Sequence, residues 1–125
     1  MSIIWIRAGG CKYVAELDDS DISNAIWLST PFKARINMLG DQIYFEMPLD
    51  AKMPEERQTV FGIGDIAYWP GVGALCIFFG PTPFSGEDGL PVSRYPLVRI
   101  GGIFGDCSGL RDVGDRQVIS LERPF

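Results

Sequence analysis

The sequence predicts a single mostly-β domain over residues 1–125, either a closed barrel or a sandwich, with about eight short strands and one or two short helices. Three observations predict this fold class. Apolar runs of strand length recur along the chain, glycine and proline mark turns between them, and two of the runs flank the Pro70-Gly71 turn. With 46% hydrophobic and 22% charged residues, a chain of 125 residues can build a core without disulfides or a metal.

The first third of the chain predicts a hairpin followed by a short helix. Residues 3–8 and 12–18 have strand character around Gly9-Gly10, and the second run alternates apolar and polar side chains. The oxygen-rich residues 18–21 suit a helix cap, and apolar residues at helical spacing follow until Pro31. We expect a helix of about two to three turns there.

The remaining strands are predicted from two kinds of pattern. Residues 32–37 and 42–47 alternate around a Gly40-Asp41 turn, which is typical of strands with one polar face. Residues 66–69 and 74–79 are apolar without alternation, which indicates strands covered on both faces. The last strands are expected at 97–100 and 117–121. Residues 54–57 are expected to form a loop or a single helical turn, and residues 84–91 a loop. Residues 101–114 form a glycine-rich segment between the last two strands.

Composition excludes several function classes. The formal charge of −5 and the absence of any basic run argue against nucleic-acid binding. The longest apolar run, residues 74–79, is too short to cross a membrane, and no signal peptide is visible, so we expect a cytoplasmic protein without a membrane partner. The three widely spaced cysteines predict no disulfide framework, and Cys76 within an apolar strand is expected in the core.

The chain contains no histidine, which excludes chemistry that depends on an imidazole within the chain. A zinc site would need three cysteines and carboxylates, and their spacing does not support one. We therefore predict no metal and no cofactor. The sequence assigns no catalytic residue, and the interpretation leans away from an enzyme.

Three motifs match known sites only in part. Residues 62–67 fit the Gly-x-Gly-x-x-Ala dinucleotide pattern, but a strand follows them instead of a helix, which favours a turn. Residues 105–115 are rich in oxygen ligands but lack calcium-loop spacing, which favours a solvated loop. The carboxylate pairs at 41 and 46 and at 55 and 56 favour a solvated surface over an acid–base pair.

Aromatic side chains near the turns form the strongest candidate site. They either line an apolar groove or fill the core, and the usual burial of aromatic residues favours the core. Arg35, on the polar face of its strand, either donates to a substrate carbonyl or pairs with Glu46 across the sheet, and we favour the pair. The aromatic residues in question are Tyr44, Tyr68, Trp69, Phe78, Phe79 and Phe84.

The segments GDIAYWP (64–70), ALCIFFGPT (74–82) and LGDQIYFE (39–46) resemble the small prokaryotic cyclophilin-like proteins of unknown function. This resemblance covers most of the chain and implies a closed eight-stranded barrel. In true cyclophilins, which are prolyl isomerases, an arginine on the outer barrel wall stands beside an apolar pocket. The resemblance places Arg35, the strand of Met47, and Phe78 at similar positions. The chain lacks the histidine, the Gln-Gly-Gly-Asp-Phe stretch and the tryptophan of that pocket.

We therefore expect a binding module for a small molecule or a peptide, with an aromatic groove and an arginine at its rim. A weak prolyl isomerase, with Arg35 as its candidate catalytic residue, is the first alternative. A non-catalytic subunit, which forms a homodimer or joins a partner protein, is the second. The expected ligand-binding residues are Arg35, Tyr44, Glu46, Met47, Trp69, Phe78 and Phe84.

Overall fold

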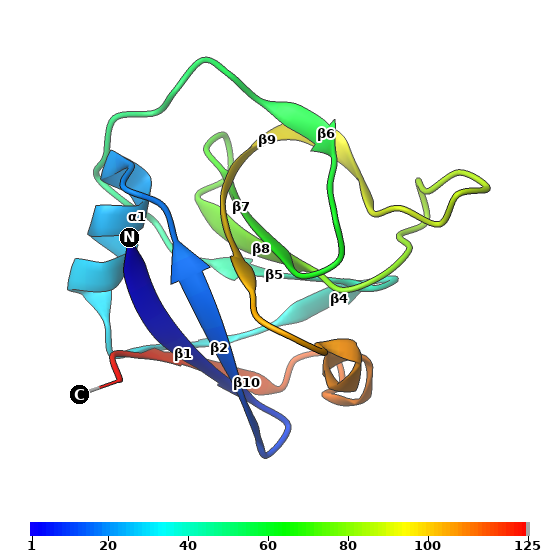
Figure 1. Ribbon diagram of the computed structural model, residues 1–125, viewed down its shortest axis with the longest axis horizontal. Helices are drawn as coiled ribbons and strands as arrows, with labels where there is room; N and C mark the ends of the chain where they lie inside the picture. Colours follow the sequence, from blue (N-terminus) through cyan, green and yellow to red (C-terminus); the bar gives the residue numbers. More distant parts are fainter. Residues whose placement is uncertain (125) are drawn as a thin grey trace.

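The computed structural model describes residues 1–124 and is dominated by antiparallel strands, with one α-helix and one 3-10 helix (Figure 1). The helices are α1 (Asp21–Ser29) and η1 (Ser108–Asp112). Neither is an apolar helix of the length that crosses a membrane. The strands are β1 (Ser2–Ala8), β2 (Cys11–Leu17), β3 (Phe32–Arg35), β4 (Asn37–Leu39), β5 (Gln42–Glu46), β6 (Gln58–Val60), β7 (Asp65–Trp69), β8 (Ala74–Phe78), β9 (Val92–Ile103) and β10 (Val118–Glu122).

The ten strands pair in the order β3-β10-β1-β2-β9-β7-β8-β5-β4, and β6 adds to β9 beside this path. The two edge strands, β3 and β4, are consecutive in the chain and separated only by Ile36. The Ile36 amide donates to the Gln117 carbonyl at 2.9 Å, and its carbonyl accepts from the Arg116 amide at 2.8 Å. Ile36 is thus tied to the loop before β10, while the chain beyond it pairs with β5.

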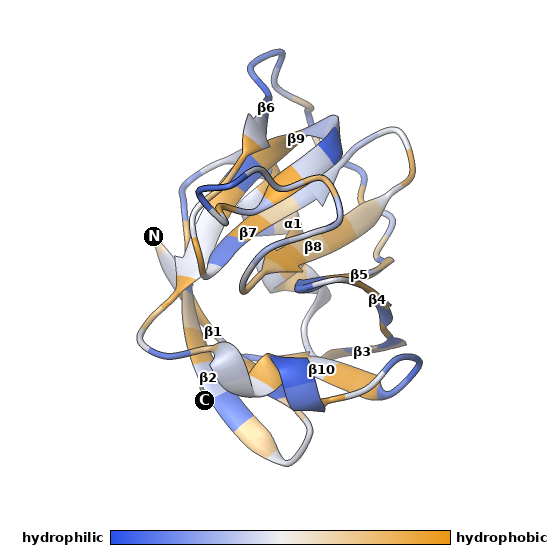
Figure 2. Ribbon diagram, turned by 90° about the vertical axis from the view of Figure 1, so that its right-hand side faces the viewer, coloured by the Kyte–Doolittle hydropathy of each residue, from blue (hydrophilic) through white to orange (hydrophobic). Residues whose placement is uncertain are grey.

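The mostly-β prediction is confirmed, but the closed eight-stranded barrel is not. The sheet is an open antiparallel ladder, because its first and last strands are paired with different neighbours and not with each other. Figure 2 shows the resulting arrangement, in which β3 lies below β4 and β5. We call the region between β3 and β5 the seam.

The sheet buries two hydrophobic clusters, one on each face. Strand β8 contributes to both, because Leu75 and Ile77 lie in the larger inner core while Cys76 and Phe78 lie in a smaller outer cluster. This confirms the prediction from the missing alternation, that the strand is covered on both faces. The outer cluster consists of Phe61, Ala67, Cys76, Phe78 and Leu97, with Tyr44 and Trp69 packed against it.

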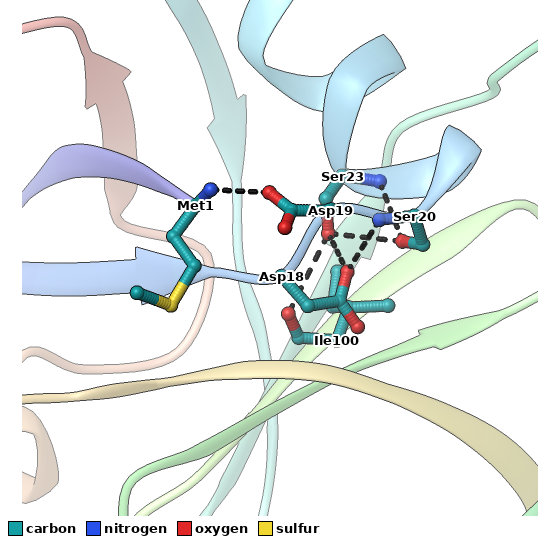
Figure 3. A network of polar contacts seen from close by, with 6 residues as sticks. All are labelled: Met1, Asp18, Asp19, Ser20, Ser23 and Ile100. Carbon is teal, nitrogen blue, oxygen red and sulfur yellow. Dashed lines mark hydrogen bonds and ion pairs between the residues drawn. The ribbon is translucent and has the colours of Figure 1, made fainter.

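Helix α1 begins where the oxygen-rich residues predicted it. The Ser20 hydroxyl accepts from the Ser23 amide at 3.2 Å, and the Asp18 carboxylate accepts from the Ser20 amide at 3.0 Å and from the Ser23 hydroxyl at 2.6 Å (Figure 3). These bonds satisfy donors that the first turn of a helix leaves free. Ile22 and Ile26 are fully buried and attach the helix to the inner core.

Strand β9 is much longer than the predicted 97–100. Its first part pairs with β6, while its second part pairs with β2 and β7. Gly101 permits the close approach to β2, because a side chain there would collide with the Glu16 carbonyl. Strand β7 pairs only with residues 98–102 of β9, so the first part of β9 extends beyond β7. This part contains residues 93–95, which line a cavity beside the outer cluster.

Candidate functional site

A cavity of about 240 Å³ lies beside the outer cluster, and we call it the aromatic groove. Strands β4, β5, β7 and β9 and the loop after β8 all contribute to it. It is lined by Leu39, Gln42, Tyr44, Trp69, Phe84, Ser93, Arg94 and Tyr95.

Three rings form a row along this groove. The Tyr44 ring meets Trp69 edge to face at 6.5 Å between centroids, and Trp69 stacks on Tyr95 at 5.3 Å and 25°. The Arg94 guanidinium lies 5.4 Å from the centre of the Tyr95 ring. Tyr95 remains 45% exposed and Phe84 43% exposed, so both offer apolar surface to a ligand.

Polar groups accompany the rings. Gln42, which lines the groove, is almost fully buried. Burial raises the pKa of the Cys76 thiol to about 12, and the neighbouring Gln42 side chain opposes the rise. Cys76 therefore stays protonated at neutral pH and is a core residue, not a nucleophile. Ser93 is also buried, and its hydroxyl accepts from the Tyr95 amide at 3.3 Å, which fixes the backbone beside the stacked ring.

The structure divides the seven predicted binding residues among three places. Tyr44, Trp69 and Phe84 meet in the aromatic groove. Met47 is 1% exposed in the inner core, and Phe78 is fully buried in the outer cluster, where it stacks on Phe61 at 4.5 Å. Neither Met47 nor Phe78 is among the residues that line the groove, so their role in ligand binding stays a prediction.

The other two predicted residues, Arg35 and Glu46, lie in a second cleft at the seam, with a volume of about 310 Å³. The Arg35 guanidinium donates to the Arg116 carbonyl at 3.0 Å, and no ion pair joins it to Glu46 in the described residues 1–124. The expected cross-sheet pair is absent because β3 and β5 are not hydrogen-bonded neighbours. The seam cleft is lined by Phe32, Lys33, Ala34, Arg35, Asn37, Glu46 and Arg116.

Comparison with known proteins fits this architecture. A family model described as cyclophilin-like matches residues 2–122. The chain belongs to the cyclophilin-like family. The solution structure of a hypothetical protein from Archaeoglobus fulgidus is similar to this cyclophilin-like chain, with a TM-score of 0.78 and 32% sequence identity. The similarity covers 98% of this chain and 94% of the other. No curated protein matches.

Sequence reasoning missed five of the eight residues that line the groove in this cyclophilin-like chain. Ser93, Arg94 and Tyr95 precede Pro96, and a proline within an apolar run argues against a strand. Leu39 and Gln42 flank a turn and carry no pattern that marks a site. Tyr95, an aromatic residue two positions before the predicted strand at 97–100, was the one signal that the sequence offered.

The partial motifs have structural explanations. The Asp65 carboxylate accepts from the Gly62 amide at 2.7 Å, which confirms the predicted turn. The segment 105–115 is not a fully solvated loop, because it contains η1 and buries Cys107 and Leu110. No group of three or more metal-ligating side chains occurs in the part of the chain that the structure describes.

Proposed function

We propose that this cyclophilin-like protein is a binding module that holds a small ligand or a short peptide in the aromatic groove. The row of Tyr44, Trp69 and Tyr95 carries the proposal. Exposed ring faces bind apolar, aromatic and proline groups, and they lose little conformational entropy on doing so. A volume of about 240 Å³ lies below the usual range for drug-sized ligands, which favours one residue-sized group of the ligand in the groove.

Polar groups at the groove give the ligand an orientation. Gln42 offers an amide beside the rings, and Arg94 offers a cation at the rim. An extended peptide supplies matching groups, because each of its carbonyls accepts hydrogen bonds and its side chains alternate in direction.

Fluorescence of Trp69 tests this proposal directly. The chain has three tryptophans, so the double variant Trp5→Phe/Trp27→Phe leaves Trp69 as the reporter. We expect a saturable change on titration with short peptides that contain proline or an aromatic residue. In the same background Tyr95→Ala should weaken binding about tenfold, which corresponds to the loss of one stacking contact.

Phe104→Ala is the matched control, since Phe104 is a 56% exposed aromatic residue that does not line the groove. Equal binding by both variants, or a ligand whose nuclear magnetic resonance shifts map away from β5, β7 and β9, would contradict the proposal.

Prolyl isomerase activity is the second candidate, and the Arg94 guanidinium beside the apolar groove favours it. Rotation about a peptide bond has a barrier of ~18–20 kcal/mol, and an apolar site with one donor to the twisted amide lowers it. Arg35, the residue first considered for this role, lies in the seam cleft instead. In a proline-peptide assay, turnover should vanish in Arg94→Ala and persist in Arg35→Ala. Wild-type activity equal to the uncatalysed rate would end this candidate.

A homodimer, or a subunit role in a larger assembly, stays a prediction. Sedimentation analysis of the purified chain measures its mass in solution, and a strictly monomeric protein that retains no partner during purification would contradict both.

A further inference from the structure

The seam cleft concentrates positive charge in a protein of formal charge −5. Lys33, Arg35 and Arg116 line it, and Glu46 is the single carboxylate among the lining residues. The ion pairs of the described residues 1–124 involve Met1, Arg7, Arg99 and Arg111 as cations, so none of the three cleft cations has a carboxylate within 4.0 Å. The cleft therefore carries an uncompensated charge that attracts anions.

Hydrogen bonds hold two of these cations in position. The Arg35 Nη1 donates to the Arg116 carbonyl at 3.0 Å, and the Arg116 Nη1 donates to the Asn37 side-chain oxygen at 3.0 Å. Each of these two bonds uses one nitrogen of its guanidinium, which leaves further N–H donors for a ligand. The loop itself is fixed, because the Asp115 carboxylate accepts from the Met38 amide at 2.9 Å.

Arg116 adopts a backbone conformation that is unfavourable for a residue with a side chain. Its φ of 65° is the sole positive φ of a non-glycine residue in the part of the chain that the structure describes. Such a conformation costs free energy for an arginine and none for a glycine, and unfavourable backbone conformations concentrate at functional sites. A role for the Arg116 guanidinium in the cleft explains why an arginine, and not a glycine, occupies this position.

We propose that the seam cleft binds the oxyanion group, carboxylate or phosphate, of a small organic molecule. Arginine presents a planar set of donors that matches both groups. The volume of about 310 Å³ exceeds that of a bare ion, and the half-buried Phe32 provides an apolar wall for the rest of the molecule. Glu46 accepts a hydrogen bond from a ligand hydroxyl or ammonium group. This site is separate from the aromatic groove and does not depend on the function proposed for it.

Titration with two probes tests the site. Inorganic phosphate and citrate are added to the folded protein at low ionic strength, and backbone amide shifts are followed by nuclear magnetic resonance. We expect saturable shifts in β3 and in residues 114–117, with binding that weakens at ~0.15 M salt because the contacts are ionic. Stronger binding of one probe identifies the preferred group.

Variants separate a site from a diffuse charge effect. Arg35→Gln should raise the Kd about tenfold, as expected for the loss of charge-assisted hydrogen bonds. Arg57→Gln is the control, since it removes the same charge from an exposed residue outside the cleft. Arg116→Gly should weaken binding by a similar factor while Tm stays equal or rises, because glycine fits the positive φ.

Three outcomes overturn the proposal. The first is the absence of saturable shifts for both probes up to about 10 mM, an affinity too weak for a specific site. The second is an equal loss of affinity in Arg35→Gln and in the Arg57→Gln control. The third is unchanged binding in Arg116→Gly together with a lower Tm, which would give Arg116 a purely structural role.

Discussion

Truncation of Phe78 to alanine distinguishes a core residue from a binding residue. The family resemblance places Phe78 with the ligand-binding aromatics, whereas the structure buries it completely in the outer cluster. Its ring is parallel to that of Phe61, with the centroids 4.5 Å apart and an angle of 8°. The structure therefore predicts a large effect on stability and no direct contact with a ligand.

The magnitude follows from the burial of the side chain. A buried phenylalanine replaced by alanine costs about 3–5 kcal/mol, and the stacked pair places Phe78 toward the upper part of that range, since such a pair adds about 0.5–1.5 kcal/mol beyond burial. A domain of this size has a free energy of unfolding of about 5–15 kcal/mol. We expect Phe78→Ala to lower it by about 4–5 kcal/mol and Tm by roughly 15–20 °C.

Urea unfolding followed by circular dichroism measures this loss. Tyr95→Ala is the matched variant, because Tyr95 is 45% exposed and should cost no more than about 1 kcal/mol. Tyr95→Ala should instead lose affinity for a groove ligand. A Phe78→Ala variant that keeps its stability within about 1 kcal/mol and loses binding would refute the reasoning.

Three further predictions concern thiols, a buried hydroxyl and the helix cap. A thiol reagent should react rapidly with the exposed Cys11 alone in the native protein, and with all three cysteines in urea, because burial raises the pKa of Cys76 to about 12 and raises that of Cys107 as well. Reaction of Cys76 in the native state would show that the outer cluster opens. Tyr68→Phe should cost about 1–2 kcal/mol in urea unfolding, since the buried hydroxyl donates to a backbone carbonyl at 2.8 Å. Ser20→Ala should cost about 1 kcal/mol and Ser20→Asp much less, because only the second keeps an oxygen that caps α1; equal losses would contradict the cap.

The strands that could be predicted best are those whose order of apolar and polar residues shows which of their faces are buried. Residues 74–79 are apolar without alternation, and β8 is indeed buried on both faces by the inner core and the outer cluster. The capped helix was also predictable, because its cap and its apolar spacing are local signals. Such signals require no knowledge of distant partners.

Strand β9 could not be predicted in full because its length depends on its partners. Its first part is a strand only because β6 pairs with it, and Pro96 lies within it. The ladder also shifts register between Ile66 and Ala67, where β7 pairs with β9. Neither the pairing with β6 nor the register shift can be predicted from the local sequence. The contribution of Ser93, Arg94 and Tyr95 to the aromatic groove was therefore not predicted.

The position of Met47 in the inner core follows from a local pattern. The alternation of residues 42–47 puts Ile43, Phe45 and Met47 on one face, and the structure buries all three in the inner core. The assignment of Met47 to a binding site came from the family resemblance and conflicted with this periodicity. A period of two fixes the direction of each side chain, so the local pattern was the better guide.

The same alternation explains why two candidate sites occur beside one short strand. Gln42, Tyr44 and Glu46 of β5 alternate with Ile43 and Phe45, whose side chains lie in the inner core. Gln42 and Tyr44 line the aromatic groove, while Glu46 lines the seam cleft. The two sites lie at different ends of β5 because the chain changes its pairing partner at Ile36. Before Ile36, β3 pairs with β10, and after it, β4 pairs with β5. In a barrel that was fully closed at this point, β3 would be hydrogen-bonded to β5 and there would be no seam. The second cleft therefore exists because the sheet is open between these two strands.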